Sequence, residues 1–325
     1  MPIGVRWGTV GAIVERVDGL VRLVVDGHPC VSFTRLTGDV QEGDIVLVNS
    51  QARELDLGSG GFDIVAVNLT RGLRLPPRDG AHVMAFPYAP GQVAIRLAEE
   101  DAASVPERID GIPVVCCGLH SQVAPVCAAL AGRRVVYVQL AGGALPVSLS
   151  DAVRALRVRR LIETTFAVAP CLDADLDCVS TASALTIAVG RGAEAIVCSI
   201  GPGIVGTGSR FGHGGVAVAE AANVATALGG RPIVAPRVSF GDARERHRGL
   251  SHHTRAALTL CLGNATRVAW PAGLERPEGI AVVEVDAGGW EDSCAALPLE
   301  HMGRGPKDDP WFFAAAYAAG VLARG

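Results

Sequence analysis

The sequence predicts an α/β protein in which a small N-terminal β-barrel precedes a mainly parallel, Rossmann-like sheet with helices on both faces. Short β-branched runs separated by Asp-Gly turns fill the first 80 residues. From residue 110, continuous apolar runs alternate with helix-length segments, which is typical of a parallel sheet covered on both faces. The pattern changes near Pro76-Pro77, so we expect a barrel-like domain over residues 1–80 and an α/β domain over residues 81–325.

The barrel prediction rests on turn residues. In VERVDGLVRLVVDGHPCVSF (residues 14–33), two Asp-Gly pairs separate β-branched runs, and Asp-Gly suits the positive φ angles of a tight hairpin turn. EGDIVLVN and FDIVAVNL predict two more strands, and closure of the sheet would remove its exposed edges. RGLRLPPRDG (residues 71–80) is the predicted linker. Two short runs around Pro90-Gly91 predict a hairpin at the edge of the next domain.

The second domain is expected to alternate strands and helices. The strand–helix pairs are IPVVCCG with QVAPVCAALA, RVVYVQL with SLSDAVRALR, RRLIETT with DCVSTASALTIAVGRG, EAIVCSI with GVAVAEAANVATALGG, and PIVAPRVSF with SHHTRAALTLCLGN. TRVAWPAG and GIAVVEVD predict two closing strands. Pro125 fits only the first turn of its helix, and Ser148 or Ser150 can cap the next helix. The alanine-rich run Phe312–Ala323 predicts a terminal helix packed on a sheet or on another subunit of a homo-oligomer.

Composition excludes several classes of function. The formal net charge is −4, from 29 basic and 33 acidic residues, which argues against a nucleic-acid partner. Lys307 is the only lysine, so a phosphate-loop or Schiff-base lysine is not expected elsewhere. No apolar run approaches the ~20 residues that span a bilayer. Nine cysteines without a CxxC pair and no secretory segment predict a reducing, cytoplasmic compartment, with Cys116, Cys117 and Cys198 acting as small buried hydrophobes.

Polar residues gather where the predicted strands end. His120 and Ser121 follow the first strand, Glu163-Thr164-Thr165 ends the third, a glycine-rich loop follows the fourth, and a stretch from Arg237 follows the fifth. Ligands of open α/β sheets bind beyond the carboxyl ends of the strands. We therefore expect residues 201–213 and 242–253 to line one cleft, reached through a right-handed crossover.

The glycine-rich loop allows three interpretations. Seven of the fifteen residues from 201 to 215 are glycine, and Gly201, Gly203 and Gly206 match G-x-G-x-x-G. A dinucleotide site is disfavoured, because four more glycines follow and Arg237 stands near the usual acidic position; an NADP phosphate there stays open. A general anion nest shaped by Gly201, Gly203, Gly206 and Gly208 is preferred to a dinucleotide site. A packing device that lets a strand and a helix approach closely is an equal alternative.

The stretch RVSFGDARERHRGLSHHT (residues 237–254) is the most polar part of the chain. Ser251 is expected to cap a helix that begins with His252 and His253. Arginine forks and neutral histidines suit an anionic ligand and acid/base chemistry, whereas a solvated basic loop is the alternative. No metal ligands are assigned, because the spacing is not HExxH and adjacent helical residues diverge by about 100°.

The candidate residues divide by role. The expected acid/base groups are His213, His247, His252 and His253. Asp242 or Glu220 would orient one of these histidines. Arg246, Arg248 and Arg210 would neutralise the charge of the ligand. Glu220 and Asn223 share one face of an otherwise apolar helix with His213, so both are expected to face a pocket or an internal polar network.

The segments GPGIVGTGSRFGHGG, EAANVATALGGRPI and RVSFGDARERHRGLSHHT resemble a bacterial family of unknown function, numbered 3866 and common in actinobacteria. The resemblance is most specific at residues 244–254 and implies no catalytic role. From the residues alone, the first hypothesis is an enzyme acting on a small anionic ligand, phosphate-bearing or nucleotide-like, with its cofactor unassigned. A non-catalytic binding or regulatory protein and a metal-dependent hydrolase using the histidines are the alternatives.

Overall fold

The computed structural model describes residues 4–57, 60–72, 80–81, 83–101 and 105–325. The predicted linker lies largely outside these described residues. Contacts divide the chain into two compact units, Met1–Arg96 and Leu97–Gly325. Each unit has its own hydrophobic core.

The first unit contains the closed five-stranded barrel that the turn residues predict. Its strands, in the order β1-β2-β3-β5-β4, are β1 (Val5–Val17), β2 (Leu20–Val25), β3 (His28–Phe33), β5 (Asp63–Asn68) and β4 (Ile45–Asn49). β3 and β5 pair in parallel, and the other pairs are antiparallel. The second Asp-Gly turn has φ angles of 48° at Asp26 and 82° at Gly27, as the sequence predicts.

Smaller elements complete the first unit. Two short helices, α1 (Thr34–Thr37) and α2 (Gln51–Glu54), flank β4 along the chain. The predicted hairpin around Pro90-Gly91 is present as β6 (Val83–Ala85) and β7 (Val93–Ile95), and the contacts group it with the barrel unit.

The second unit is built on an eight-stranded parallel sheet, which confirms the predicted fold class. Its strands in spatial order are β11 (Leu176–Cys178), β10 (Thr164–Val168), β9 (Val135–Leu140), β12 (Ala195–Ile200), β8 (Pro113–Cys117), β13 (Arg231–Ala235), β16 (Arg267–Pro271) and β17 (Val283–Val285). Every residue of β8, β9 and β12 is buried, as expected for strands covered on both faces. Cys116, Cys117 and Cys198 are buried in these strands.

One predicted strand is misplaced. β10 begins at Thr164, where the sequence predicted the strand to end, and the short β11 was not predicted. The apolar residue Ile162 suggested a strand, but it lies before β10 and packs in the core with Leu156 of the preceding helix. Tertiary packing, and not strand formation, explains its apolar character.

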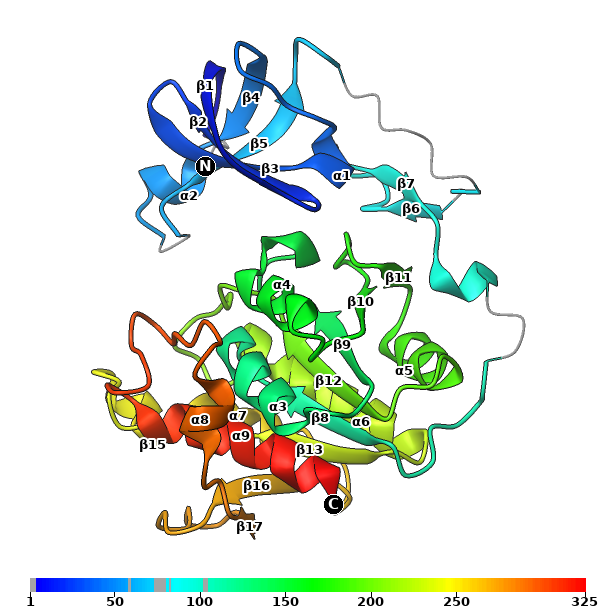
Figure 1. Cartoon of the computed structure of the whole chain (residues 1–325), viewed down its shortest axis with the longest axis vertical. Helices are drawn as coiled ribbons and strands as arrows, with labels where there is room; N and C mark the ends of the chain where they lie inside the picture. Colours follow the sequence, from blue (N-terminus) through cyan, green and yellow to red (C-terminus); the bar gives the residue numbers. More distant parts are fainter. Residues whose placement is uncertain (1–3, 58–59, 73–79, 82, 102–104) are drawn as a thin grey trace. The chain divides into compact units, whose positions relative to one another are not determined.

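Helices cover both faces of the sheet (Figure 1). One face carries α3 (Val123–Ala129), α4 (Asp151–Val158), α8 (Trp290–Cys294) and α9 (Pro310–Arg324). The other face carries α5 (Thr181–Gly190), α6 (Ala217–Ala227) and α7 (His252–Leu258). A short two-stranded ribbon, β14 (Val238–Ser239) with β15 (Gly249–Leu250), lies between β13 and α7 in the chain.

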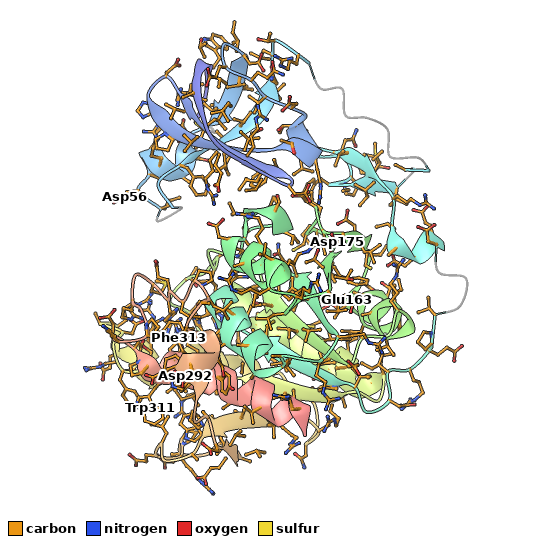
Figure 2. The ribbon with its side chains drawn as sticks, in the orientation of Figure 1. Asp56, Glu163, Asp175, Asp292, Trp311 and Phe313 are labelled. Atoms are coloured by element: carbon orange, nitrogen blue, oxygen red, sulfur yellow. The ribbon has the colours of Figure 1, made fainter. Side chains whose placement is uncertain are left out.

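The helix ends follow the predicted signals. Ser150 caps α4 by accepting from the amide of Val153 at 3.0 Å, and Ser251 caps α7. The terminal helix α9 packs on the sheet and along α3, where a Cβ on Gly320 would lie 2.5 Å from the Val126 carbonyl oxygen. Phe313 near the start of α9 (Figure 2) stacks on Trp290 of α8. Within the described chain, no helix has the length and apolar character needed to cross a membrane.

The strand order determines where a site can form. After β11 the chain returns to insert β12 between β9 and β8, and then places β13 on the other side of β8. The loops that follow β12 and β13 therefore leave the same edge of the sheet on either side of the end of β8. This carboxyl edge is where parallel α/β sheets bind ligands.

Candidate functional site

The glycine-rich loop and the segment from residue 242 meet beside α7, as the sequence predicts. A hollow of about 930 Å³, called the larger hollow here, is lined by Gly208, Arg210, Arg246 and one side of α7 from His252 onward. Residues between 261 and 281 complete its wall. A smaller hollow of about 440 Å³ adjoins it and shares Arg246, His252 and Arg255. The site extends from the carboxyl edge of the sheet along α7.

The larger hollow is positively charged. Arg210, Arg246 and Arg255 line it, and none of the described residues in its wall is a carboxylate. Arg210 lies over the ring of Phe211, 5.0 Å from the ring centroid, and Arg255 donates to the carbonyl of Glu278 at 3.2 Å. Clefts lined by charges of one sign attract ligands of the opposite sign. The charged side chains that line this hollow therefore have the sign that attracts anions.

The smaller hollow is more mixed in charge. Arg248 lines only this hollow, together with Glu245 and Glu275. Arg276 also lines it, but its Nε lies 2.6 Å from a carboxylate oxygen of Glu284. The three arginines that were predicted to neutralise charge therefore line different hollows. Arg246 lines both, Arg210 lines the larger one, and Arg248 lines the smaller one.

Four histidine rings come together at the start of α7. The rings of His213 and His253 stack with centroids 3.8 Å apart, and those of His252 and His253 lie 4.4 Å apart. His247 lies 4.8 Å from both His252 and His253. One ring nitrogen from each of His213, His252 and His253 lies within 4.8 Å of the other two. The expectation that His252 and His253 diverge too far to share a ligand is therefore wrong. Their side-chain torsions bring the two rings together although the two residues point in different directions from the helix.

The four rings differ in the hydrogen bonds that their nitrogens form. Nε2 of His213 lies 3.1 Å from the carbonyl oxygen of Arg210, so this nitrogen carries the proton and Nδ1 holds a free lone pair. Nδ1 of His213 and Nε2 of His252 are buried and have no hydrogen-bond partner within the described chain. His247 Nδ1 is 2.7 Å from Ser251 Oγ, and His253 Nδ1 is 3.4 Å from Arg237 Nη1.

All four histidines are held neutral near pH 7. Burial is the main cause that lowers the pKa of each ring. Burial and the charge of Arg237 lower the pKa of His247 to about 3. Burial, with smaller effects from His213 and Arg237, lowers the pKa of His253 to about 2. Neutral imidazoles can accept a proton, donate a hydrogen bond or bind a metal ion.

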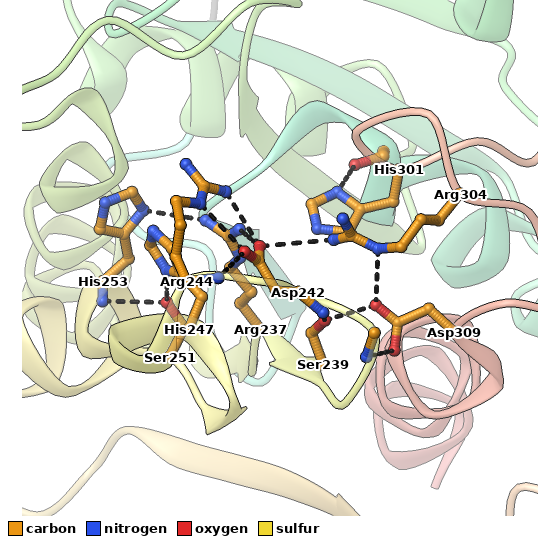
Figure 3. Close-up of polar contacts among 12 residues, drawn as sticks. Arg237, Ser239, Asp242, Arg244, His247, Ser251, His253, His301, Arg304 and Asp309 are labelled. Carbon is orange, nitrogen blue, oxygen red and sulfur yellow. Dashed lines mark hydrogen bonds and ion pairs between the residues drawn. The ribbon is translucent and has the colours of Figure 1, made fainter.

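Asp242 is the centre of a buried ion-pair network (Figure 3). Its carboxylate lies 3.0 Å from Arg237, 2.9 Å from Arg244 and 3.4 Å from Arg304. Hydrogen bonds from Arg244 hold the pKa of Asp242 well below its usual range. The proposed role of Asp242 in orienting a histidine is a misassignment, because guanidinium donors occupy its oxygens.

The same network engages Arg237. Arg237 is 3% exposed, and burial lowers its pKa to about 10. Because its guanidinium is committed to Asp242, it is not placed to contact the phosphate of NADP. Arg304 continues the network to Asp309, which also accepts a 3.0 Å hydrogen bond from the amide of Phe240. These contacts fix the segment that follows β13.

The glycine-rich loop is partly closed by backbone contacts within the protein. The amides of Val205 and Thr207 donate to the carbonyls of Gly142 and Gly212 at 2.9 and 2.7 Å, and an antiparallel bridge joins Gly206 to His213. A Cβ on Gly201 would lie 2.1 Å from the carbonyl oxygen of Ala144. Close packing against neighbouring backbone and side-chain atoms explains the glycines at 201 and 206. Gly203 has a φ of 68°, a conformation that favours glycine. Of the four glycines, only Gly208 lines the larger hollow.

The two polar residues of α6 have separate roles. Glu220 is exposed, and no hydrogen bond or ion pair in the described chain joins it to a histidine, so it does not belong to an internal polar network. His213 precedes α6 in extended conformation, and helical spacing does not apply to it. Asn223 forms an internal polar contact, donating to the Leu260 carbonyl at 3.0 Å and accepting from the Leu262 amide at 2.8 Å.

Sequence reasoning missed a third contributor to this region, the segment before α9. It supplies His301, Arg304 and Asp309; the His301 ring stacks on Phe312 at 3.8 Å, and its Nδ1 lies 3.2 Å from Ser121 Oγ. These residues follow no strand of the parallel sheet directly, so the strand-end rule did not select them. The polar run HMGRGPKDDP, placed before an apolar helix, was the available signal.

A family model with the description "Protein of unknown function (DUF3866)" matches residues 30–320. The match covers most of the chain and agrees with the resemblance found in the sequence. No curated protein matches the chain.

Proposed function

We propose that this chain, which belongs to the family DUF3866, is an enzyme that acts on a small anionic substrate held in the larger hollow. One observation carries the proposal: three arginines and a histidine line a hollow of about 930 Å³ whose described wall contains no carboxylate. Guanidinium groups bind phosphate and carboxylate oxygens through paired hydrogen bonds. The volume is sufficient for a phosphate-bearing or nucleotide-like molecule.

The histidine cluster supplies the chemistry in this proposal. His252 belongs to both hollows and lies against His213 and His253, so it is the ring nearest to a bound anion. Its burial keeps it neutral in the free protein, and an anion beside it would raise its pKa and favour proton uptake. His252 is thus the proposed acid/base group, while Arg246 and Arg255 hold the charge of the substrate.

A binding or regulatory protein is the second candidate. His247 and His253 have pKa values of about 3 and about 2, far below the range in which a general base works well at neutral pH. The pocket could therefore hold an anion without converting it. A ligand recovered unchanged after incubation with the protein would favour this candidate, whereas a product would favour the enzyme.

The proposal is tested by thermal shift with inorganic phosphate, nucleotides and sugar phosphates. A ligand at a hundredfold excess over its dissociation constant should stabilise the fold by about 2.7 kcal/mol. Arg246→Ala combined with Arg255→Ala should remove the shift. Arg191→Ala, at the far end of α5 in an exposed position, is the matched control and should keep it. If no anion shifts the melting temperature of the wild-type chain, the proposed function is wrong.

The compartment belongs to the same proposal. All nine cysteines are free thiols, and most are buried. Free thiols at this number support a reducing, cytoplasmic environment, where disulfides are rare.

A further inference from the structure

We propose that His213, His252 and His253 form a binding site for a zinc-class metal ion, with a fourth coordination position open to the larger hollow. The site itself stands on the geometry of the three rings. Its role, to hold an oxygen of the bound anion, rests on the proposed function, and in the metal-bound protein His252 is a ligand in place of the proton-transfer group assigned above.

The three ring nitrogens are already close to a ligand arrangement. They lie within 4.8 Å of one another, and tetrahedral zinc with bonds of about 2.0–2.1 Å to nitrogen needs separations of about 3.4 Å. Small rotations of the rings close this difference. His252 also lines the larger hollow, whereas His213 is buried, so an ion held by the three rings would lie beside that hollow.

Two buried ring nitrogens without a partner in the described chain point to a missing ligand. His213 is 5% exposed, and its Nδ1 has no hydrogen-bond partner in the described chain; the same is true of His252 Nε2. Buried polar atoms are normally paired, because leaving one unpaired costs free energy. Nε2 of His213 is bonded to the Arg210 carbonyl, which is the outer contact that metal-binding histidines usually make.

Two glycines leave room for His213 at this position. A Cβ on Gly206 would lie 2.8 Å from the Cβ of His213, and a Cβ on Gly215 would lie 3.1 Å from His213 Nδ1. Both distances are shorter than ordinary contacts to a side chain. These contacts of the glycine-rich loop position a histidine, in line with the packing role that the sequence left open beside an anion nest.

The ligand set selects the class of ion. Three neutral imidazoles without a carboxylate suit Zn²⁺ and similar transition metals, and do not suit Mg²⁺ or Ca²⁺, which prefer oxygen. Nearby arginines oppose a cation, and an anionic ligand in the fourth position offsets them. His253 can bind the ion only if the 3.4 Å contact between its Nδ1 and Arg237 opens, because a neutral ring that accepts from Arg237 at Nδ1 carries its proton on Nε2. Arg237 keeps a partner when this contact opens, since it also pairs with Asp242.

The test measures metal in the full chain, purified without a histidine tag. The protein is loaded with Zn²⁺, passed through gel filtration and analysed for metal by mass spectrometry. We expect about one ion per chain, lost in His213→Gln and in His252→Gln. His28→Gln, which removes an exposed histidine of the barrel unit, is the matched control and should retain the ion.

A second measurement does not depend on the variants' folding. Co²⁺ added to the wild-type chain should give the intense visible absorption of a four-coordinate site with nitrogen ligands. A pale, six-coordinate spectrum, or no stoichiometric ion after zinc loading, overturns the site. In the first measurement, zinc binding by the triple variant His213→Gln/His252→Gln/His253→Gln at wild-type affinity also overturns the site.

The metal and anion experiments distinguish failure of the metal site from failure of the proposed function. Arg246→Ala with Arg255→Ala should remove the anion-induced thermal shift and leave the zinc stoichiometry unchanged. An ion without any anion-induced shift would retain the metal site and reject the proposed function. An anion-induced shift without an ion would retain the proposed function and reject the metal site.

Discussion

Asp242 illustrates how burial decides the role of a single residue. The sequence placed this carboxylate in a polar stretch with three histidines, where orienting one of them was a reasonable expectation. In the structure, three arginines surround it, and the histidine rings meet one another instead. Which groups pair within such a stretch depends on side-chain torsions and on distant segments such as the one holding Arg304. Neither can be obtained from local sequence.

Replacement of Asp242 should destabilise the fold strongly. Asp242→Asn removes the charge that compensates buried Arg237, and breaking a buried ion pair typically costs about 3–5 kcal/mol. Asp18→Asn disrupts an exposed pair with Arg35 and is the matched control, with an expected cost of about 0–1 kcal/mol. Urea unfolding of both variants measures the difference. Equal stability of the two variants would contradict the structural role of the network.

The network also gives stability a defined pH dependence. The pKa of Asp242 is lowered in the folded state, so its contribution is full above its unfolded value of about 3.9. The contribution is lost as the pH falls below that value toward the folded pKa. The difference in unfolding free energy between the wild-type chain and Asp242→Asn should therefore shrink as the pH is lowered from 5 toward 2 (~3 pH units). A constant difference across this range would argue against the ionised pair.

At the scale of elements, the sequence predicts regular structure better than loops. Alternation, Asp-Gly turns and serine caps correctly indicated the barrel, the parallel sheet, and the starts of α4 and α7. The glycine-rich loop was ambiguous because glycine serves both an anion nest and close backbone packing. Only the structure distinguishes the anion nest from close packing, because it places Gly142 and Ala144, in the loop after β9, against Gly214 and Gly201.

A pair of alanine substitutions tests the packing role of this loop. Gly201→Ala would place a Cβ 2.1 Å from the Ala144 carbonyl oxygen, whereas a Cβ on Gly208 meets nothing within 4 Å. We expect Gly201→Ala to destabilise the fold by about 1–3 kcal/mol, the usual cost of overpacking. Gly208→Ala should change stability by less than about 0.5 kcal/mol. Thermal unfolding of both variants is the measurement. Equal melting temperatures would show that the loop does not have the packing role inferred here.

At the scale of the whole molecule, the site depends on topology. His213 follows β12, while His252 and His253 follow β13, and these strands lie on either side of β8. The sequence could predict that both loops leave the same edge, because that holds for all parallel strands. It could not predict that three ring nitrogens converge to within 4.8 Å, because this depends on strand order and on side-chain torsions.

The α/β unit should fold without the barrel. Contacts separate Met1–Arg96 from Leu97–Gly325, and each unit has its own apolar core. A fragment of residues 97–325 should therefore unfold cooperatively and retain the anion-induced thermal shift of the full chain. A fragment without a cooperative transition would show that the barrel completes the fold of the second unit.

The central claim is that the arginine-lined hollow beside the histidine cluster binds an anion. Calorimetric titration of pyrophosphate into the full chain tests it most directly. The account predicts saturable binding at about one site per chain, lost in Arg246→Ala/Arg255→Ala and retained in Arg191→Ala. Absence of saturable heat in the wild-type chain, or equal binding by the double variant, would contradict the claim.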